Sequence, residues 1–139
     1  MKVAVLALAC VALAACETLQ APGPRDGPHP SDTCVLLSVA SKNGATDTIL
    51  GQAMQARLHD IQTAALQRPA YQCGDVSYQT DPNQLGMTFL EAGFSADRHY
   101  AALKLQTVAG PLAGEGYTCL YEAEDESWTL RGCRMDWIS

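Results

Sequence analysis

The sequence contains little positive charge, with nine Lys and Arg residues against fifteen Asp and Glu residues and a formal net charge of −6. Because nucleic-acid affinity comes mainly from Lys and Arg on phosphates, this balance argues against a nucleic-acid partner. It argues equally against a polybasic patch that would bind an anionic membrane surface. The length of 139 residues, with 47 % hydrophobic and 17 % charged residues, predicts one folded domain and not a disordered polymer.

The sequence also lacks an apolar segment long enough to span a bilayer. The longest, Val3–Ala15, has thirteen residues, which as a helix would cover ~20 Å of a hydrocarbon core that is ~30 Å thick. It follows Met1 and Lys2 and ends in small residues. This pattern predicts a secretory signal peptide over residues 1–15.

The residues Leu13-Ala14-Ala15-Cys16 resemble the lipobox of bacterial lipoproteins. The resemblance, which is confined to the N-terminus, implies that a diacylglyceryl group joins the Cys16 thiol, that cleavage precedes Cys16 and that the new amine is acylated. Several acyl chains give lasting membrane attachment, because each buried CH₂ adds ~0.8 kcal/mol. Glu17 and not Asp follows the lipidated cysteine, which in this family implies the outer membrane, facing the periplasm.

Residues 16–33 are expected to form a lipidated, Pro-rich tether, and residues 34–139 a single α+β domain. The tether contains four prolines, which remove backbone donors and disfavour helix and sheet: Pro22, Pro24, Pro28 and Pro30. His29 lies between two of them, where a lone exposed histidine is expected to be inert.

The strongest helix signal lies between Thr46 and Arg68. Apolar residues recur there at helical spacing: Leu50, Met54, Leu58, Ile61 and Ala65. Thr46 and Asp47 offer an N-cap, and Arg68-Pro69 ends the pattern. The shorter apolar run Cys34–Ala40 fits either a buried strand or a helical turn, and Gly44 ends it.

Strand signals follow the helix. Five segments combine period-two alternation with turn residues between them: 76–80, 86–95, 99–108, 117–123 and 128–139. The fold class predicted is therefore α+β, with one long amphipathic helix followed by an antiparallel β-meander of about four strands. Alternation in the last segment changes phase at Gly132, which predicts a β-bulge there.

Four cysteines remain once Cys10 is removed with the signal peptide and Cys16 is lipidated, and an even number in an exported chain predicts disulfides. Of the three possible pairings, we expect Cys34–Cys73 with Cys119–Cys133. A hairpin turn centred on Glu126 places Cys119 opposite Cys133, although a bulge at Gly132 would shift this register by one residue. Because C-x-x-C and H-x-H spacings are absent, no metal is expected.

The function predicted first is a non-catalytic, protein-binding role for a lipid-anchored envelope protein, in assembly, as an accessory or as an inhibitor, with another envelope protein as partner and no cofactor. The alternative is a small-ligand-binding domain. A long helix on a curved antiparallel sheet resembles cystatin-like and nuclear-transport-factor-like folds, and the latter often enclose a pocket.

A hydrolase that uses His59 or His99 is a third hypothesis. Ser95, Asp97 and His59 supply the residue types of a hydrolytic triad, but Ser95 is not in a G-x-S-x-G motif. The sequence therefore predicts no catalytic residues.

Three further features have two interpretations each. Gly114-Glu115-Gly116 could cradle a phosphate or form a turn. The acidic run from Glu122 to Glu126 could dock a basic partner or form a solvated hairpin turn. Trp128 and Trp137 are expected in the core, and an exposed tryptophan would indicate an interface.

The lipid anchor is testable by metabolic labelling. Cells that express the chain and grow on radiolabelled palmitate should label it, and a Cys16→Ser variant should stay unlabelled, because serine cannot form the thioether. Cys10→Ser is the matched control and should label normally. An unlabelled native chain would contradict the anchor.

Overall fold

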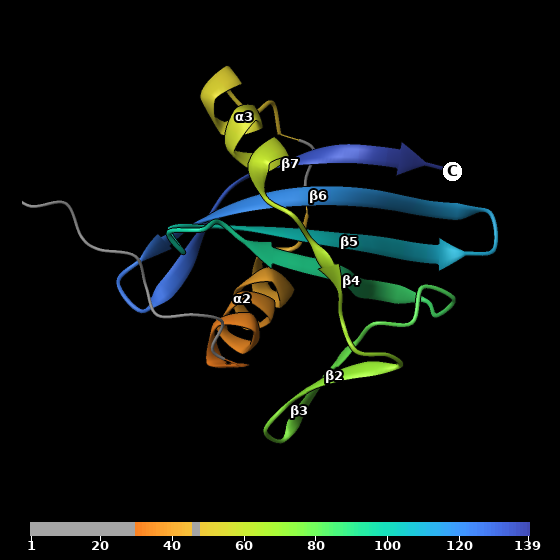
Figure 1. Ribbon diagram of the computed structural model, residues 1–139. Helices are drawn as coiled ribbons and strands as arrows, with labels where there is room; N and C mark the ends of the chain where they lie inside the picture. The colour runs from red at the N-terminus through yellow and green to blue at the C-terminus, as the bar shows by residue number, and fades with distance from the viewer. Residues whose placement is uncertain (1–29, 46–47) are drawn as a thin grey trace, which may run out of the picture.

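The computed structural model describes residues 30–45 and 48–139 (Figure 1). The predicted signal peptide, Cys16 and residues 17–29 of the predicted tether lie outside these residues. The described residues are mostly β-sheet, with 51 % strand and 20 % helix. The predicted fold of one long helix followed by a meander of about four strands is therefore wrong, because this part of the chain forms two short helices, a five-stranded antiparallel sheet and a two-stranded sheet.

The large sheet has the strand order β1-β4-β5-β6-β7. Its strands are β1 (Ala64–Ala65), β4 (Gly86–Phe94), β5 (Tyr100–Gly110), β6 (Ala113–Glu124) and β7 (Ser127–Ile138). The small sheet is a hairpin of β2 (Ala70–Cys73) and β3 (Val76–Gln79). The last four predicted strand segments thus correspond to β4–β7, and segment 76–80 to β3.

The first helix, α2, covers Pro30–Asn43 and includes the apolar run whose structure the sequence left open. Proline is favourable in the first turn of a helix, where its missing N–H is not needed, so α2 includes the last residues of the predicted tether. Gly44 ends α2 with a positive φ of 67°, and its N–H donates to the carbonyl of Ala40.

α2 packs on one face of the large sheet and closes the main core. Leu36, Leu37 and Ala40 are fully buried there against alternate residues of β5 and β6, among them Leu103 and Tyr121. Side chains alternate along strands, so this face collects nearly all the large apolar residues. Among the residues that the structure describes, no helix combines the length and apolar character needed to cross a membrane.

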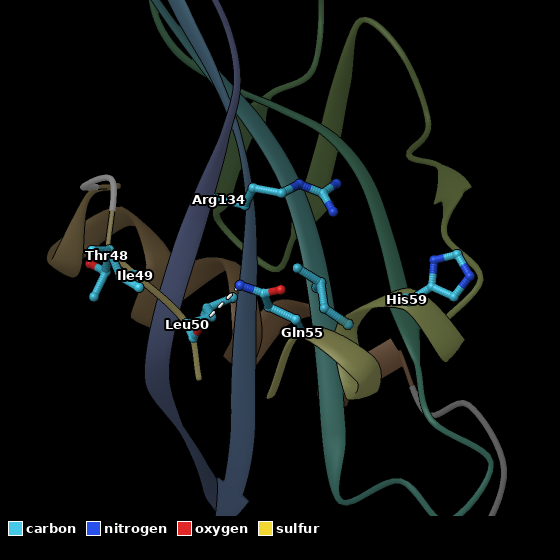
Figure 2. A pocket seen from close by; sticks show the side chains of 7 residues that line it. Thr48, Ile49, Leu50, Gln55, His59 and Arg134 are labelled. Carbon is cyan, nitrogen blue, oxygen red and sulfur yellow. Dashed lines mark hydrogen bonds between the residues drawn. The ribbon is translucent and has the colours of Figure 1, made fainter. Parts of the chain in front are cut away.

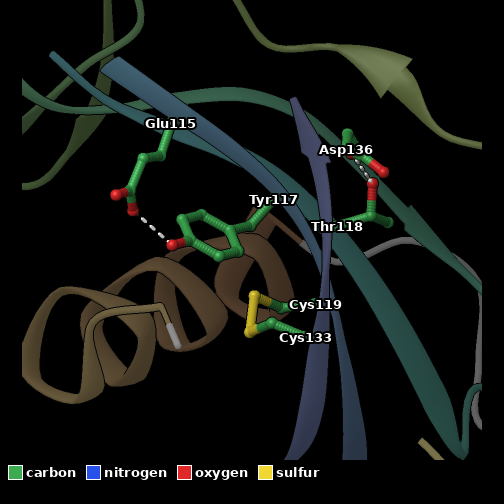
Figure 3. Close-up of a disulfide and its surroundings, with 6 residues drawn as sticks. All are labelled: Glu115, Tyr117, Thr118, Cys119, Cys133 and Asp136. Carbon is green, nitrogen blue, oxygen red and sulfur yellow. Dashed lines mark hydrogen bonds between the residues drawn. A yellow bond between two sulfur atoms is a disulfide. The ribbon is translucent and has the colours of Figure 1, made fainter. Parts of the chain in front are cut away.

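The described residues form two disulfides, with the pairing expected from the sequence. Cys34–Cys73 joins α2 to the end of β2. Cys119–Cys133 joins β6 to β7 under α2, and both cysteines are fully buried (Figure 3).

The second helix, α3, covers only Gln52–Asp60, so the long helix expected between Thr46 and Arg68 is not formed. Thr46 and Asp47, the expected cap, lie outside the described residues. The chain becomes extended at Ile61, and β1 pairs with Glu91 and Ala92 of β4. Helical periodicity continues to Ala65, but the helix ends at Asp60 and pairing with the edge of the sheet replaces it.

The α3 segment, residues 48–63, lies across the second face of the sheet (Figure 1). Beneath it, one cross-strand row has only small or apolar residues: Gly93, Ala102, Leu120 and Gly132. A Cβ on Gly93 would lie 2.1 Å from the carbonyl oxygen of Gln62, and a Cβ on Gly132 would lie 2.5 Å from Leu50. Glycines at both ends of the row therefore let the segment contact the sheet closely.

In the β6–β7 hairpin Cys119 lies opposite Cys133, as predicted, although the turn differs from the predicted one. Glu124 pairs with Ser127, so the turn is one residue tighter than expected and the first pairs are offset. Arg131 then bulges beside Gly132, as the phase change predicted, and this bulge restores the register in which Cys119 faces Cys133. The two displacements cancel.

The close contact at Gly93 gives a stability prediction. Gly93→Ala should lower the free energy of unfolding by about 1–3 kcal/mol in urea titrations, because the new methyl group meets the backbone of Gln62. Gly110→Ala is the matched control, since a Cβ at Gly110 meets no atom within 4 Å. Equal stability of the two variants would contradict the close packing of the α3 segment.

Candidate functional site

A polar row crosses the sheet beside the α3 segment, on the same face. Its members pair directly across the four long strands: Glu91, Lys104, Thr118 and Arg134. Lys104 lies 3.9 Å from Glu91, and Arg134 lies 3.0 Å from Asp136, which bulges out of β7. The Thr118 hydroxyl also donates to Asp136 (Figure 3). Charges in this row are therefore compensated locally.

An open cleft lies between the α3 segment and this row. The α3 cleft has a volume of about 420 Å³ and is lined by Thr48, Ile49, Leu50, Gln55, Leu58, His59 and Arg134 (Figure 2). The amide of Gln55 donates to the carbonyl of Leu50 at 2.9 Å, which holds one side of the cleft in place. Ile49 is 98 % exposed. A large apolar side chain thus lies in water beside polar groups.

The other end of the same face has an aromatic ring on its surface. Trp137 is 41 % exposed and pairs with Gly116 of β6. A Cβ on Gly116 would lie 2.0 Å from the indole nitrogen, and one on Gly114 would lie 3.2 Å from the ring. The indole therefore lies directly over the backbone of two glycines, and only glycine leaves it that space.

Beside this ring lies a second open site, the Trp137 trough, with a volume of about 340 Å³. Gln106 and Asn83 supply amide side chains to its lining, and none of its lining side chains is charged. Gln106 is only 6 % exposed, and its Nε2 donates to the carbonyl of Pro82 at 2.6 Å. This hydrogen bond holds the loop between β3 and β4 against the sheet as one side of the trough.

These positions correct two predictions. Gly114-Glu115-Gly116 is neither a phosphate cradle nor a turn, because it lies within β6 and its glycines accommodate Trp137. Trp128 is buried as expected, but Trp137 is not in the core. The bulge at Asp136 causes this difference, since one extra residue turns the following side chain to the opposite face.

Ser95 and Asp97, members of the hypothetical triad, lie together in the turn between β4 and β5. The Ser95 hydroxyl donates to Asp97 at 2.6 Å, and the backbone N–H of His99 donates to the same oxygen at 3.1 Å. The Ser95 oxygen also accepts from the N–H of Tyr100 at 3.0 Å. These bonds close the turn, whereas His59 lies on α3 and lines the α3 cleft.

The same hydrogen bonds alter the acidity of the turn. Donation from Ser95, and then from the N–H of His99, lowers the pKa of Asp97 below its ordinary value.

The carboxylates of the acidic run between Glu122 and Glu126 also have local partners. Glu122 pairs with Arg131 at 2.5 Å and Glu124 accepts from Thr129 at 2.6 Å, within the solvated β6–β7 hairpin.

Across residues 30–45 and 48–139, no three His, Cys, Asp or Glu side chains gather in a group that could hold a metal ion. The sequence missed Ile49, Gln55, Gln106 and Arg134 as site residues, because no motif or spacing distinguishes them.

Comparison with known protein families, with characterised proteins and with solved structures finds no match to this chain.

The Asp97 turn gives a pH prediction. Because its folded pKa is lowered, the carboxylate contributes stability that is complete above a pH of about 4 and is lost as the pH falls through the lowered pKa. Asp97→Asn should therefore be less stable than the native chain at pH 7 in urea titrations, and the difference should vanish in acid.

Asp60→Asn is the matched control for this experiment, because it removes an exposed carboxylate that makes no such pair of hydrogen bonds. It should leave the stability difference near zero at every pH. A deficit of Asp97→Asn that persists unchanged at pH 2 would show that the charge of Asp97 does not act.

Proposed function

We propose that this chain is a lipid-anchored protein of the bacterial cell envelope whose domain binds another envelope protein and catalyses no reaction. The resemblance of Leu13-Ala14-Ala15-Cys16 to a lipobox supports the anchor. The disulfides Cys34–Cys73 and Cys119–Cys133 support an oxidising compartment, where such bonds form and persist.

The location that we propose is the outer membrane, with the domain facing the periplasm. Glu17 supports this choice, because Asp at this position is the signal for inner-membrane retention in the lipoproteins that the N-terminus resembles. The Pro-rich tether would place the domain away from the lipid surface, since such segments favour extended conformations.

The observation that carries the binding role is Ile49 beside the α3 cleft. Exposed apolar side chains next to a polar rim are typical of protein contact sites, where a few anchors supply most of the affinity. Ile49 is 98 % exposed, and Gln55, His59 and Arg134 surround the same cleft with polar groups. A partner that buries Ile49 would gain apolar contact and find hydrogen-bonding groups around it.

A small ligand in the α3 cleft is the second candidate function. The α3 cleft has a volume of about 420 Å³, which lies within the range of ~300–1,000 Å³ usual for ligand pockets. The α3 cleft is open and lies on the surface of the sheet, however, whereas the pocket of a nuclear-transport-factor-like fold is enclosed.

Site-specific photo-crosslinking tests the protein-binding role. A photoreactive amino acid at position 49, in cells that express the full chain, should give one dominant crosslinked protein after irradiation. The same residue at position 112 is the matched control, because Leu112 is also an exposed apolar residue, at 88 %, but lies outside the α3 cleft.

An additional Arg134→Ala substitution at the edge of the cleft should weaken the crosslink at position 49 by severalfold. Equal crosslinking from positions 49 and 112, or none from either, would contradict a partner at the α3 cleft. Saturable binding of a metabolite that protects position 49 would favour the small-ligand alternative.

A further inference from the structure

The Trp137 trough differs chemically from the α3 cleft and is independent of the proposed protein contact. A flat aromatic face is available there, because Trp137 lies over Gly114 and Gly116 with 41 % of its surface exposed. Neutral amide groups of Gln106 and Asn83 line the same trough.

The support beneath the ring fixes its orientation. The two glycines leave no side chain between the indole and the backbone of β6, and Trp137 lies opposite Gly116 in the register. Gln106 is only 6 % exposed and donates to the carbonyl of Pro82 in the β3–β4 loop, so its amide is also held in place. Ring and amide therefore need little reorganisation to receive a ligand.

Charge narrows the class of ligand. None of the side chains that line the trough is charged, although the whole chain has a net charge of −6. In the adjacent polar row, Lys104 pairs with Glu91 and Arg134 with Asp136. The lining therefore offers an ionic ligand no charged side chain with which to pair.

From this combination we infer that the Trp137 trough binds a strand of β-1,4-linked N-acetylhexosamine, the sugar type of bacterial wall glycan. A pyranose ring has one apolar face of C–H groups, which carry slight positive charge and match the negative face of an indole. Its hydroxyl and acetamido groups match the donors and acceptors of amide side chains. The volume of about 340 Å³ accommodates a small ligand segment.

Isothermal titration of the full chain with chitotetraose, in a detergent without a sugar head group, tests this inference. The native chain should bind saturably, and Trp137→Ala should weaken the affinity at least tenfold. Trp137→Phe keeps a flat ring and should lose less than Trp137→Ala. Leu112→Ala is the matched control, because Leu112 is exposed at the same end of the sheet but does not line the trough.

Intrinsic fluorescence gives an independent measurement. The chain has two tryptophans, and Trp128 is 4 % exposed in the core. Chitotetraose should therefore change the emission of the native chain, while the emission of Trp137→Phe, which comes from Trp128, should stay constant.

Asn83→Ala covers the case in which Trp137→Ala fails to fold. It alters an exposed loop side chain of the trough and should weaken binding severalfold.

The inference is overturned if the native chain does not bind chitotetraose, or if folded Trp137→Ala and Asn83→Ala bind it as tightly as the native chain does. Crosslinking of position 137 to a protein, without chitotetraose binding, would identify the trough as a protein contact and overturn the glycan. None of these results depends on crosslinking at position 49.

Discussion

The close contact between the α3 segment and one row of the sheet determines the rest of the second face. Gly93 and Gly132 remove side chains at both ends of that row, and Ala102 and Leu120 between them meet Leu58 and its apolar neighbours. Because the segment crosses only this part of the sheet, Lys104 and Trp137 beyond it stay partly exposed. The α3 cleft forms along the margin of the contact, and the polar row and the Trp137 trough lie beyond it.

The two faces of the sheet therefore have different roles. The face under α2 holds the large apolar residues and the Cys119–Cys133 disulfide, and it provides most of the core. On the other face, the bulge at Asp136 places Trp137 on the surface, over a glycine pair in β6. Both proposed contacts lie on this second face, so a protein partner at Ile49 and a glycan at Trp137 would approach the domain from the same side.

Much of the sheet could be predicted from the sequence, because alternation and turn residues from residue 86 onward follow the strands closely. The cysteine register was predicted because the bulge beside Gly132 offsets the tighter turn. The prediction of one long helix is wrong because residues 61–65, although their apolar residues have helical spacing, are extended, and Ala64 and Ala65 pair with β4. The site could not be predicted. The exposure of Trp137 depends on the bulge at Asp136, which no change in the alternation of the sequence indicates. The place of Gln106 depends on its hydrogen bond to Pro82, a contact between distant parts of the chain.

The Cys34–Cys73 disulfide has a mechanical consequence if the chain is anchored at Cys16. Tension between a membrane and a captured partner would enter the domain at Pro30, where α2 begins. Peeling of the helix from that end would stop at Cys34, because the covalent bond transfers the load to β2. The ion pair between Asp32 and Arg98, at 3.1 Å, resists the first step. The domain would thus bear a pull that would unravel an unbridged helix.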